Sequence, residues 1–162
     1  MPELPYMTDE AKRWIGHETV EVSDPVSLRQ IREYLAGTDD WNPLYYDEEY
    51  AKGTQYGGII ASRMFYRAPL RKVLLESELQ EDGQYPDRSV PGVYGRSMAG
   101  SQEVEVFEPV RPGDVLTLTS TVLDIYEKQG RSGRLIFQIN RDSYTNQRGE
   151  QVAVEIKTTI SR

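Results

Sequence analysis

The residues best suited to chemistry lie in one short stretch, residues 38–47, which reads Thr-Asp-Asp-Trp-Asn-Pro-Leu-Tyr-Tyr-Asp. It places a carboxylate, Asp40, two residues before the amide Asn42, and the phenol of Tyr45 follows. Pro43 fixes its own φ and favours an extended conformation in the residue before it, so the stretch is predicted to form a rigid loop. Such a loop can direct Asp40 and Asn42 into one pocket. The alternative is that these polar residues only form turns.

The acid-base groups of this loop are unequal. Ionised Asp40 can accept a proton and act as a general base toward water. Tyr45 has an ordinary pKa of about 10, so at neutral pH it can donate a hydrogen bond or orient water but cannot readily take a proton. The only histidine, His17, lies in a predicted strand, and a structural or surface role is favoured for it. Because the loss of one acid-base group typically costs about 10² to 10⁴ in rate, this loop alone is expected to be a slow catalyst.

Two helical patterns flank the loop. A helix over residues 25–36 is predicted from Asp24 as its N-cap, a proline at the first helical position and apolar residues at helical spacing. Gly37 is predicted to end this helix in the left-handed conformation. On the other side of the loop, Asp47 is predicted to cap a short helix over residues 48–52.

The longest predicted helix covers residues 62–77. Its pattern offers several apolar residues for burial: Met64, Phe65, Leu70, Val73 and Leu74. Pro69 removes a backbone donor and clashes with the preceding turn, so this helix is expected to kink or break near Ala68. A long loop over residues 78–97, rich in glycine, proline and charge, is predicted to follow it.

The remainder of the chain alternates apolar and polar residues, which predicts strands. A short first strand is predicted over residues 17–22, and four longer ones over residues 98–107, 115–126, 134–144 and a last segment that carries Val152, Val154, Ile156 and Thr158. Leu135, Phe137 and Ile139 are predicted to share one strand face. Short turns between successive strands favour an antiparallel meander. Helices followed by a meander predict an α+β fold in which the sheet curls around a central helix. Its open edges favour a dimer.

Length and composition narrow the class of protein. The 162 residues are predicted to form one domain, with residues 1–15 as an N-terminal arm. The absence of cysteine excludes disulfides and thiolate metal sites and fits a reducing cytoplasm. A net charge of −7 without a basic block argues against a nucleic-acid partner. The chain has neither a signal-peptide pattern nor the roughly 18 apolar residues of a membrane span, so a soluble protein is expected.

The loop also resembles the hydratase motif of the MaoC-like enzymes, which are the (R)-specific enoyl-CoA hydratases and 3-hydroxyacyl dehydratases of the hot-dog fold. The family motif runs Gly-Asp-x-Asn-Pro-x-His-x-Asp. Here Asp40 matches the aspartate, Asn42 and Pro43 match the Asn-Pro pair, and Tyr45 stands at the histidine position. The chain most resembles the dehydratase-like N-terminal branch, which often works beside a second hot-dog with the complete Asp and His pair. The likeness continues through residues 50–51, 56–61, 111–114 and 126–134.

The resemblance implies a single α+β hot-dog domain whose active sites form between the protomers of a dimer. It implies reversible addition of water to a 2-enoyl thioester of CoA or an acyl carrier, without a cofactor or a metal. It places Asp40, Asn42 and Tyr45 at catalytic positions, and it places the substrate-binding positions at Gly58, Ser62, Arg63 and Arg67. In the family, a backbone amide at the start of the central helix polarises the thioester carbonyl, and residues 61–63 stand at that point.

Several interpretations remain open at the level of the sequence. The favoured hypothesis is a hydratase or dehydratase subunit that binds the acyl chain while a partner hot-dog supplies the Asp and His pair. The alternatives are a homodimeric hydratase that uses Asp40, a hot-dog thioesterase with Glu76 as its only candidate carboxylate on the long helix, and an acyl-binding module without turnover. Arg63, Arg67, Arg71 and Lys72 recur along that predicted helix and either contact CoA phosphates or form its solvated face.

Overall fold

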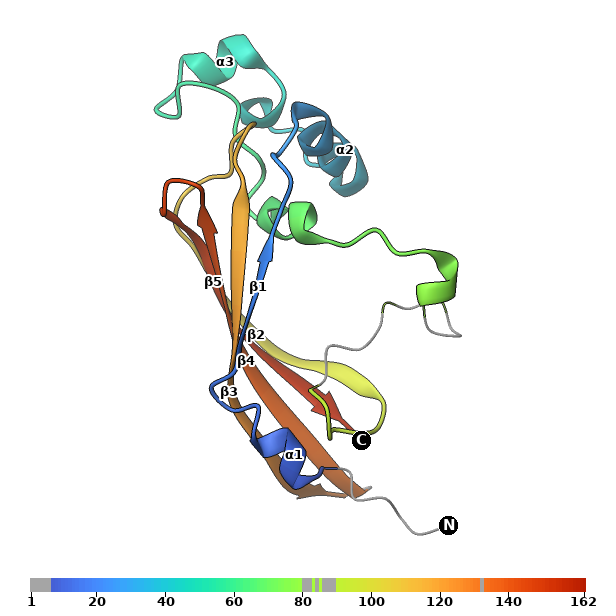
Figure 1. Ribbon diagram of the computed structural model, residues 1–162. Coiled ribbons are helices and arrows are strands. Elements are labelled where there is room, and N and C mark those ends of the chain that lie inside the picture. The colour runs from blue at the N-terminus through green and yellow to red at the C-terminus, as the bar shows by residue number, and fades with distance from the viewer. Residues whose placement is uncertain (1–6, 80–82, 84, 86–89, 132) are drawn as a thin grey trace.

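Five strands form one antiparallel sheet in the order β1-β3-β4-β5-β2 (Figure 1). The structure is a computed structural model that describes residues 7–79, 83, 85, 90–131 and 133–162. The strands are β1 (Glu18–Val22), β2 (Ser97–Val106), β3 (Leu116–Gly130), β4 (Gly133–Asn146) and β5 (Gln151–Ser161). All five were predicted within a few residues. The N-terminal arm and the 78–97 loop lie partly outside the described residues.

The predicted four-stranded meander is only partly correct. β3, β4 and β5 do follow one another as neighbours, but β2 pairs with the far side of β5 instead of with β3. The segment that connects β2 to β3 is not a hairpin turn. Its backbone forms hydrogen bonds with segments outside these two strands. The Ala61 amide donates to the Val110 carbonyl at 2.8 Å, and the Gly113 amide donates to the Val26 carbonyl at 2.7 Å. This connection therefore ties the helical half of the chain to the sheet.

Two apolar clusters lie on the inner face of the sheet, one toward each end. The α2 cluster lies beneath the helix α2 (Leu28–Thr38), and its buried members include Ile31, Phe65, Leu116, Tyr144 and Val152. The α1 cluster lies beneath α1 (Asp9–Lys12), and its buried members are Ala11, Val90, Val122, Ile125 and Ile136. The N-terminal arm is thus packed on the sheet through Ala11, which is fully buried.

A band of polar side chains separates the two clusters. On β3, the inner-face positions change from Leu118 to Ser120 and back to Val122. The same change occurs on β4, from Tyr144 to Asp142 and back to Ile136, while the paired inner-face positions of β1 are polar and those of β5 change from Ala153 to polar residues. We call this set the polar band: Thr19, Glu21, Ser120, Gln138, Asn140, Asp142, Glu155, Lys157 and Thr159.

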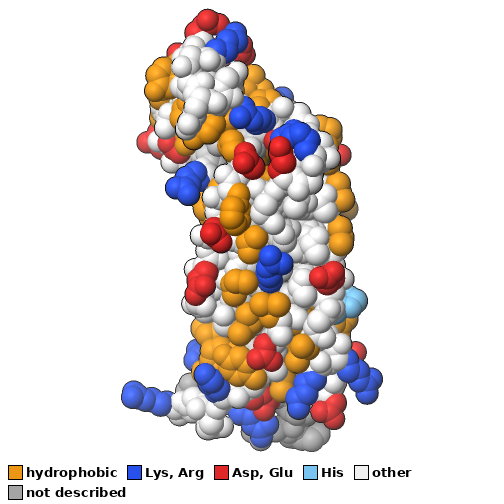
Figure 2. All heavy atoms as spheres, turned by 90° about the vertical axis from the view of Figure 1, so that its left-hand side faces the viewer, with side chains coloured by type: hydrophobic (Ala, Val, Ile, Leu, Met, Phe, Trp, Pro, Cys, Tyr) orange, Lys and Arg blue, Asp and Glu red, His pale blue; other side chains and the backbone are white. Residues whose placement is uncertain are grey.

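The outer face of the sheet carries three apolar residues of β4. Leu135, Phe137 and Ile139 share a face as predicted, but it is the half-exposed outer face and not the core. Phe137 stacks on Tyr126 with ring centroids 5.1 Å apart. Figure 2 views the molecule from this side and shows apolar side chains interspersed with charged ones. Among the described residues, no helix is long and apolar enough to cross a membrane.

The helix α2 begins later and ends later than predicted. Ser27, and not Asp24, caps it: the Ser27 hydroxyl accepts from the Gln30 amide at 3.1 Å, and the Gln30 side chain accepts from the Ser27 amide at 2.8 Å. This reciprocal capping box satisfies two backbone donors at once, which Asp24 cannot do from its position. Asp39, and not Gly37, takes the left-handed conformation, with a φ of 54°.

The predicted long helix over residues 62–77 does not form. Its place is taken by the 3-10 helix η2 (Phe65–Leu70), after which Arg71 is extended with a ψ of 115°. Pro69 accounts for much of this, because it cannot donate to the preceding turn. Phe65 and Leu70 are buried as expected, but Val73 is 97% exposed, so the later apolar residues do not pack on the sheet. The chain continues through the 3-10 helix η3 (Glu76–Glu78), away from the inner face (Figure 1).

Candidate functional site

The side chains of the motif loop mostly hold the loop itself. Asn42 Oδ1 accepts a hydrogen bond from the Leu44 amide at 3.1 Å and caps the 3-10 helix η1 (Pro43–Tyr45). Asp47 Oδ1 accepts from the Tyr50 amide at 3.0 Å and caps α3 (Glu48–Lys52), as predicted. For Asn42 these contacts match the turn-forming alternative.

Asp40 is exposed in the chain by itself. Among the described residues its carboxylate has no hydrogen-bond partner, and Asp40 is not part of the lining of the cavity beside Tyr45. Its negative charge nevertheless raises the pKa of the Tyr45 phenol. The loop therefore places Asp40 within electrostatic reach of Tyr45, while the Asn42 side chain hydrogen-bonds to the loop backbone.

A cavity of about 280 Å³ lies beside Tyr45, and we call it the motif cavity. Three segments build it: the motif loop, the segment before η2, and the residues that follow β2. Its lining includes Tyr45, Tyr56, Ala61, Ser62, Arg63 and Tyr66. Of the predicted site residues, the fold thus gathers Tyr45, Ser62 and Arg63.

The phenol of Tyr45 stays protonated at neutral pH. Partial burial makes the largest contribution to raising its pKa. The charge of Asp40 raises the pKa further, and so does Tyr56. The guanidinium of Arg63 acts in the opposite direction, but the net pKa lies above the ordinary value. Tyr45 can consequently donate a hydrogen bond into the motif cavity but cannot serve as a base there.

The backbone amides of Ser62 and Arg63 are available to a ligand. The preceding residues are fixed, because the Ile60 amide donates to the Leu44 carbonyl at 3.3 Å and the Ala61 amide donates to Val110. The next two amides make no hydrogen bond within the part of the chain that is described. Ser62 is buried whereas Arg63 is exposed, so the first of these two donors is shielded from bulk water, and both can donate to a carbonyl oxygen.

Two predicted substrate-binding residues lie elsewhere. Gly58 lines a separate hollow beside Ile59 and Arg111. Arg67 turns toward the polar band, where its Nε donates to Glu155 at 2.5 Å. Nothing in the sequence pattern marked Tyr66, whose hydroxyl donates to the same carboxylate and whose ring lines the motif cavity. The one signal was the acidic Glu155 between apolar neighbours of β5, and it is fully buried.

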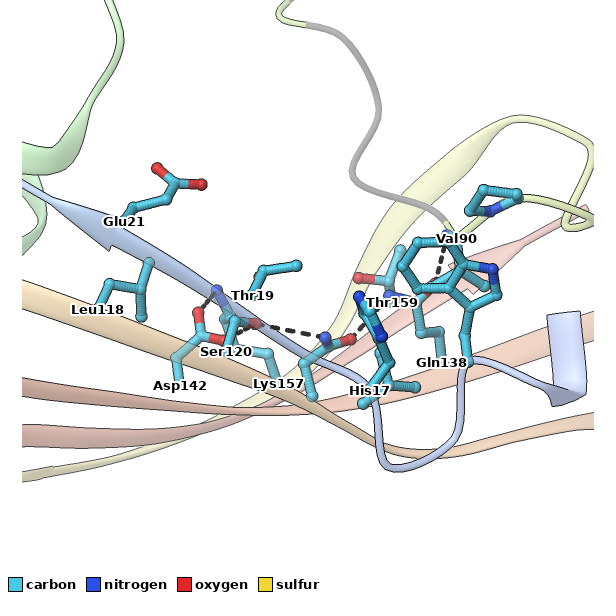
Figure 3. A pocket seen from close by; sticks show the side chains of 14 residues that line it. His17, Thr19, Glu21, Val90, Leu118, Ser120, Gln138, Asp142, Lys157 and Thr159 are labelled. Atoms are coloured by element: carbon cyan, nitrogen blue, oxygen red, sulfur yellow. Dashed lines mark hydrogen bonds and ion pairs between the residues drawn. The ribbon is translucent and has the colours of Figure 1, made fainter.

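A second cavity, of about 350 Å³, lies over the polar band, and we call it the band cavity (Figure 3). Ser120, Gln138, Asp142 and Lys157 line it from β3, β4 and β5. His17 also lines it, with its ring 4.4 Å from that of Trp14. The only histidine is therefore outside the motif cavity.

Comparison with known protein families identifies the chain. The model of the FAS1-like dehydratase domain region matches residues 13–155. The chain belongs to this family. A UPF0336 protein of Streptomyces avermitilis is 32% identical over 143 residues, which cover 86% of this chain and 87% of that protein. A probable enoyl-CoA hydratase alpha subunit of Thermomonospora curvata is 28% identical over 151 residues, which cover 88% of this chain but only 47% of that protein.

Solved structures confirm the predicted fold class of this FAS1-like dehydratase domain. The ChsH1-ChsH2 complex of Mycobacterium tuberculosis matches with a TM-score of 0.74 at 18% identity, covering 93% of this chain and 86% of that one. The MaoC-like dehydratase of Rhodospirillum rubrum matches with a TM-score of 0.65 at 24% identity, with 91% of each chain covered. The chain is an α+β hot-dog with a five-stranded antiparallel sheet.

Proposed function

We propose that this chain is one subunit of a hot-dog hydratase or dehydratase that acts on a 2-enoyl or 3-hydroxyacyl thioester. In this proposal the chain binds the acyl part of the substrate, and a second hot-dog subunit supplies the complete Asp and His pair. The reaction needs a base to activate water, an acid for the α-carbon and donors for the thioester oxygen.

The phenol of Tyr45 at the histidine position carries this proposal. A pKa raised above about 10 leaves no general base on Tyr45 at neutral pH. His17 cannot replace it, since it lies beside Trp14 at the band cavity. Among the described residues, Asp40 is the carboxylate whose charge acts on the phenol, and Glu108 also lines the motif cavity; both are exposed in the single chain. The histidine of the family motif is thus missing from the motif cavity.

The requirement for donors to the thioester oxygen is better supported. The amides of Ser62 and Arg63 can donate to the thioester oxygen, and the hydroxyl of Tyr45 lines the same cavity. The exposed guanidinium of Arg63 lies at the motif cavity, where it can meet a phosphate of CoA or of an acyl carrier. We therefore assign substrate binding, and not proton transfer, to this chain.

The position of the open sheet edge supports a partner. Within the described residues β2 pairs only with β5, so its other edge has free backbone groups. Val106 ends β2, and both Val106 and Phe107 line the motif cavity. A hot-dog paired along β2 would lie beside this cavity and could complete it. Two of the similar proteins are named as complexes, ChsH1-ChsH2 and HadBC, and a third is named as an alpha subunit.

A homodimeric hydratase is the second candidate. The observation in its favour is that the charge of Asp40 reaches Tyr45, so a carboxylate and a hydrogen-bond donor are close together. A thioesterase receives less support, because Glu76 lies in η3 and lines neither the motif cavity nor the band cavity.

Reconstitution tests the proposal. The tagged chain is co-expressed with a hot-dog protein that carries the complete Asp-x-Asn-Pro-x-His motif and is encoded in an adjacent reading frame, and hydration of crotonyl-CoA and longer enoyl-CoAs is measured. We expect turnover only from the complex, with loss of about 10² to 10⁴ when the histidine of that second protein is replaced by alanine. Asp40→Asn in this chain should leave the turnover largely intact. The reverse pattern, with loss only for Asp40→Asn, would support the homodimer.

A further inference from the structure

The band cavity is lined by a connected series of hydrogen-bonding side chains. The Val90 amide donates to Gln138 Oε1 at 3.0 Å, and Gln138 Nε2 donates to Asn140 Oδ1 at 2.7 Å. Ser120 Oγ donates to Asp142 Oδ1 at 2.6 Å, and Asp142 forms an ion pair with Lys157. Figure 3 shows Ser120, Gln138, Asp142 and Lys157 among the side chains that line the cavity. The series fixes their orientation and makes the wall a preformed polar surface.

Further polar groups of this wall remain available. The hydroxyls of Thr19 and Thr159 line the cavity, and they have no hydrogen-bond partner in the part of the chain that is described. The side-chain amide of Asn140 reaches Ser120 only at 3.5 Å, a long distance for a hydrogen bond. An occupant of the cavity is therefore offered both donors and acceptors.

The charges of the wall are already balanced. Asp142 is 1% exposed and is paired with Lys157, while Glu21 lies 4.0 Å from Lys72. A charged occupant would disturb the pair of Asp142 and Lys157, because the buried carboxylate needs its partner. A neutral occupant leaves this pair intact.

Apolar side chains complete the cavity. Trp14, Leu118 and Val122 line it together with the polar band. A volume of about 350 Å³ falls within the range of about 300–1,000 Å³ typical of ligand pockets. An unbranched alkyl chain would fit the apolar part but would strip water from the hydroxyls and amides without replacing its hydrogen bonds. A group with both apolar carbon and neutral oxygen or amide functions matches the whole lining.

The band cavity is linked to the motif cavity through Glu155. The Glu155 carboxylate accepts a hydrogen bond from Tyr66, which lines the motif cavity. It also lies 3.8 Å from Nζ of Lys157, which lines the band cavity. One fully buried side chain thus contacts a lining residue of each cavity, so the two cavities are separated by little more than Tyr66, Glu155 and Lys157.

We infer that the band cavity receives the distal part of the acyl group, and that this part is neutral and carries hydroxyl, carbonyl or amide functions. The inference rests on the proposed function, because it takes the occupant to be the acyl part of the thioester substrate. It adds a preference that the proposed function does not contain: an oxygen-bearing acyl group is bound more tightly than the unsubstituted chain of the same length.

Trp14 provides a direct readout of the cavity. The chain contains two tryptophans, so Trp41→Phe leaves Trp14 as the only one. Labelling this chain with 5-fluorotryptophan gives a ¹⁹F signal that reports on the band cavity even in a complex with an unlabelled partner. Hexanoyl-, octanoyl- and decanoyl-CoA are titrated against their ω-hydroxy counterparts, with CoA alone as the blank. Saturated thioesters are used because they cannot be hydrated.

The expected result is a shift of the Trp14 signal with the acyl-CoAs but not with CoA. At the best chain length the ω-hydroxy compound should bind about tenfold more tightly, the effect of about one well-formed hydrogen bond. Asn140→Leu should remove this preference and keep or improve binding of the plain acyl-CoA, which also shows that the variant is folded. Thr119→Val, on the outer face of the neighbouring strand, is the matched control and should retain the preference.

Three results would overturn the inference. Equal or tighter binding of the plain chains at every length would remove the polar preference. Binding of the thioesters without a change at Trp14 would place the acyl group elsewhere and leave the proposed function intact. Failure of every thioester to bind, to the chain and to its complex, would reject the proposed function and this inference with it.

Discussion

The α2 cluster and the polar band occupy the same face of the same three strands, yet their chemistry is opposite. Leu116, Tyr144 and Ala153 pack beneath α2 and η2, and all three are buried among apolar neighbours. A few residues further along the strands, Asn140 and Lys157 face a cavity. What covers a sheet face therefore decides its composition. The inner face of this sheet is apolar where α2 and η2 cover it. It is polar where the 62–77 segment leaves it uncovered.

The largest expected effect comes from the covered region. Phe65 is 1% exposed and makes an edge contact with Tyr34 at a centroid distance of 5.4 Å. Phe65→Ala should lower the free energy of unfolding by about 3–5 kcal/mol, because it removes buried area and leaves a cavity. Phe137→Ala on the half-exposed outer face is the matched control and should cost clearly less. Urea denaturation measures both; equal losses would show that the α2 cluster is not the principal core.

The next effect comes from the polar band. Asp142→Ala should cost about 3 kcal/mol, since it leaves the ammonium of Lys157 unpaired and also removes the acceptor of Ser120. The double variant Asp142→Leu, Lys157→Met should recover most of this loss, because no unpaired charge remains. The free energies of unfolding of the single and double variants are measured by urea denaturation and compared. A double variant less stable than the single one would mean that the ion pair stabilises the fold by itself.

The smallest effect is a pH dependence at the junction of the two regions. Burial raises the pKa of Tyr66 and of Tyr144, and Glu155 adds to the increase. In the unfolded chain these phenols ionise near pH 10, while in the folded chain they stay protonated. Stability is therefore complete below about pH 10 and falls as the pH rises further, by at most about 1.4 kcal/mol per pH unit for each tyrosine. Tyr66→Phe should reduce the slope measured by urea unfolding between pH 9 and 11, and an unchanged slope would contradict it.

The strands could be predicted from the sequence, and so could the shared face of Leu116, Leu118 and Val122 on β3, but the inner face of β4 could not. Leu135, Phe137 and Ile139 alternate with Gln138 and Asn140, and such a pattern normally points its apolar side to the core. Here the polar side faces inward, because it lines a cavity and not a packed core. Periodicity reports which residues share a face, but it does not report what the face meets.

The missing central helix shows a second limit. Phe65, Leu70 and Val73 have a spacing that suits a helix, and the kink at Pro69 was anticipated. Local spacing does not say whether a surface is available for the later residues, and Val73 finds none. The helix therefore does not extend to residue 77, because the later residues have no surface to pack on, although propensity and spacing alone would favour a helix there.

The candidate site could be predicted as a location more readily than as a mechanism. The motif loop does lie at a cavity with Ser62 and Arg63, which the resemblance anticipated. The side chain of Asn42 caps a turn, however, and sequence alone cannot separate a capping amide from a catalytic one. The exposure of Asp40 likewise depends on whether a partner covers the loop.

The most direct test is the rate at which the purified chain alone hydrates crotonyl-CoA and longer enoyl-CoAs. The account predicts a rate at least about 10² below that of the reconstituted complex, because Tyr45 cannot take a proton. Tyr45→His restores the missing base beside Asp40 and should raise the rate of the chain alone. Full turnover by the unmodified chain, abolished by Asp40→Asn, would contradict the account.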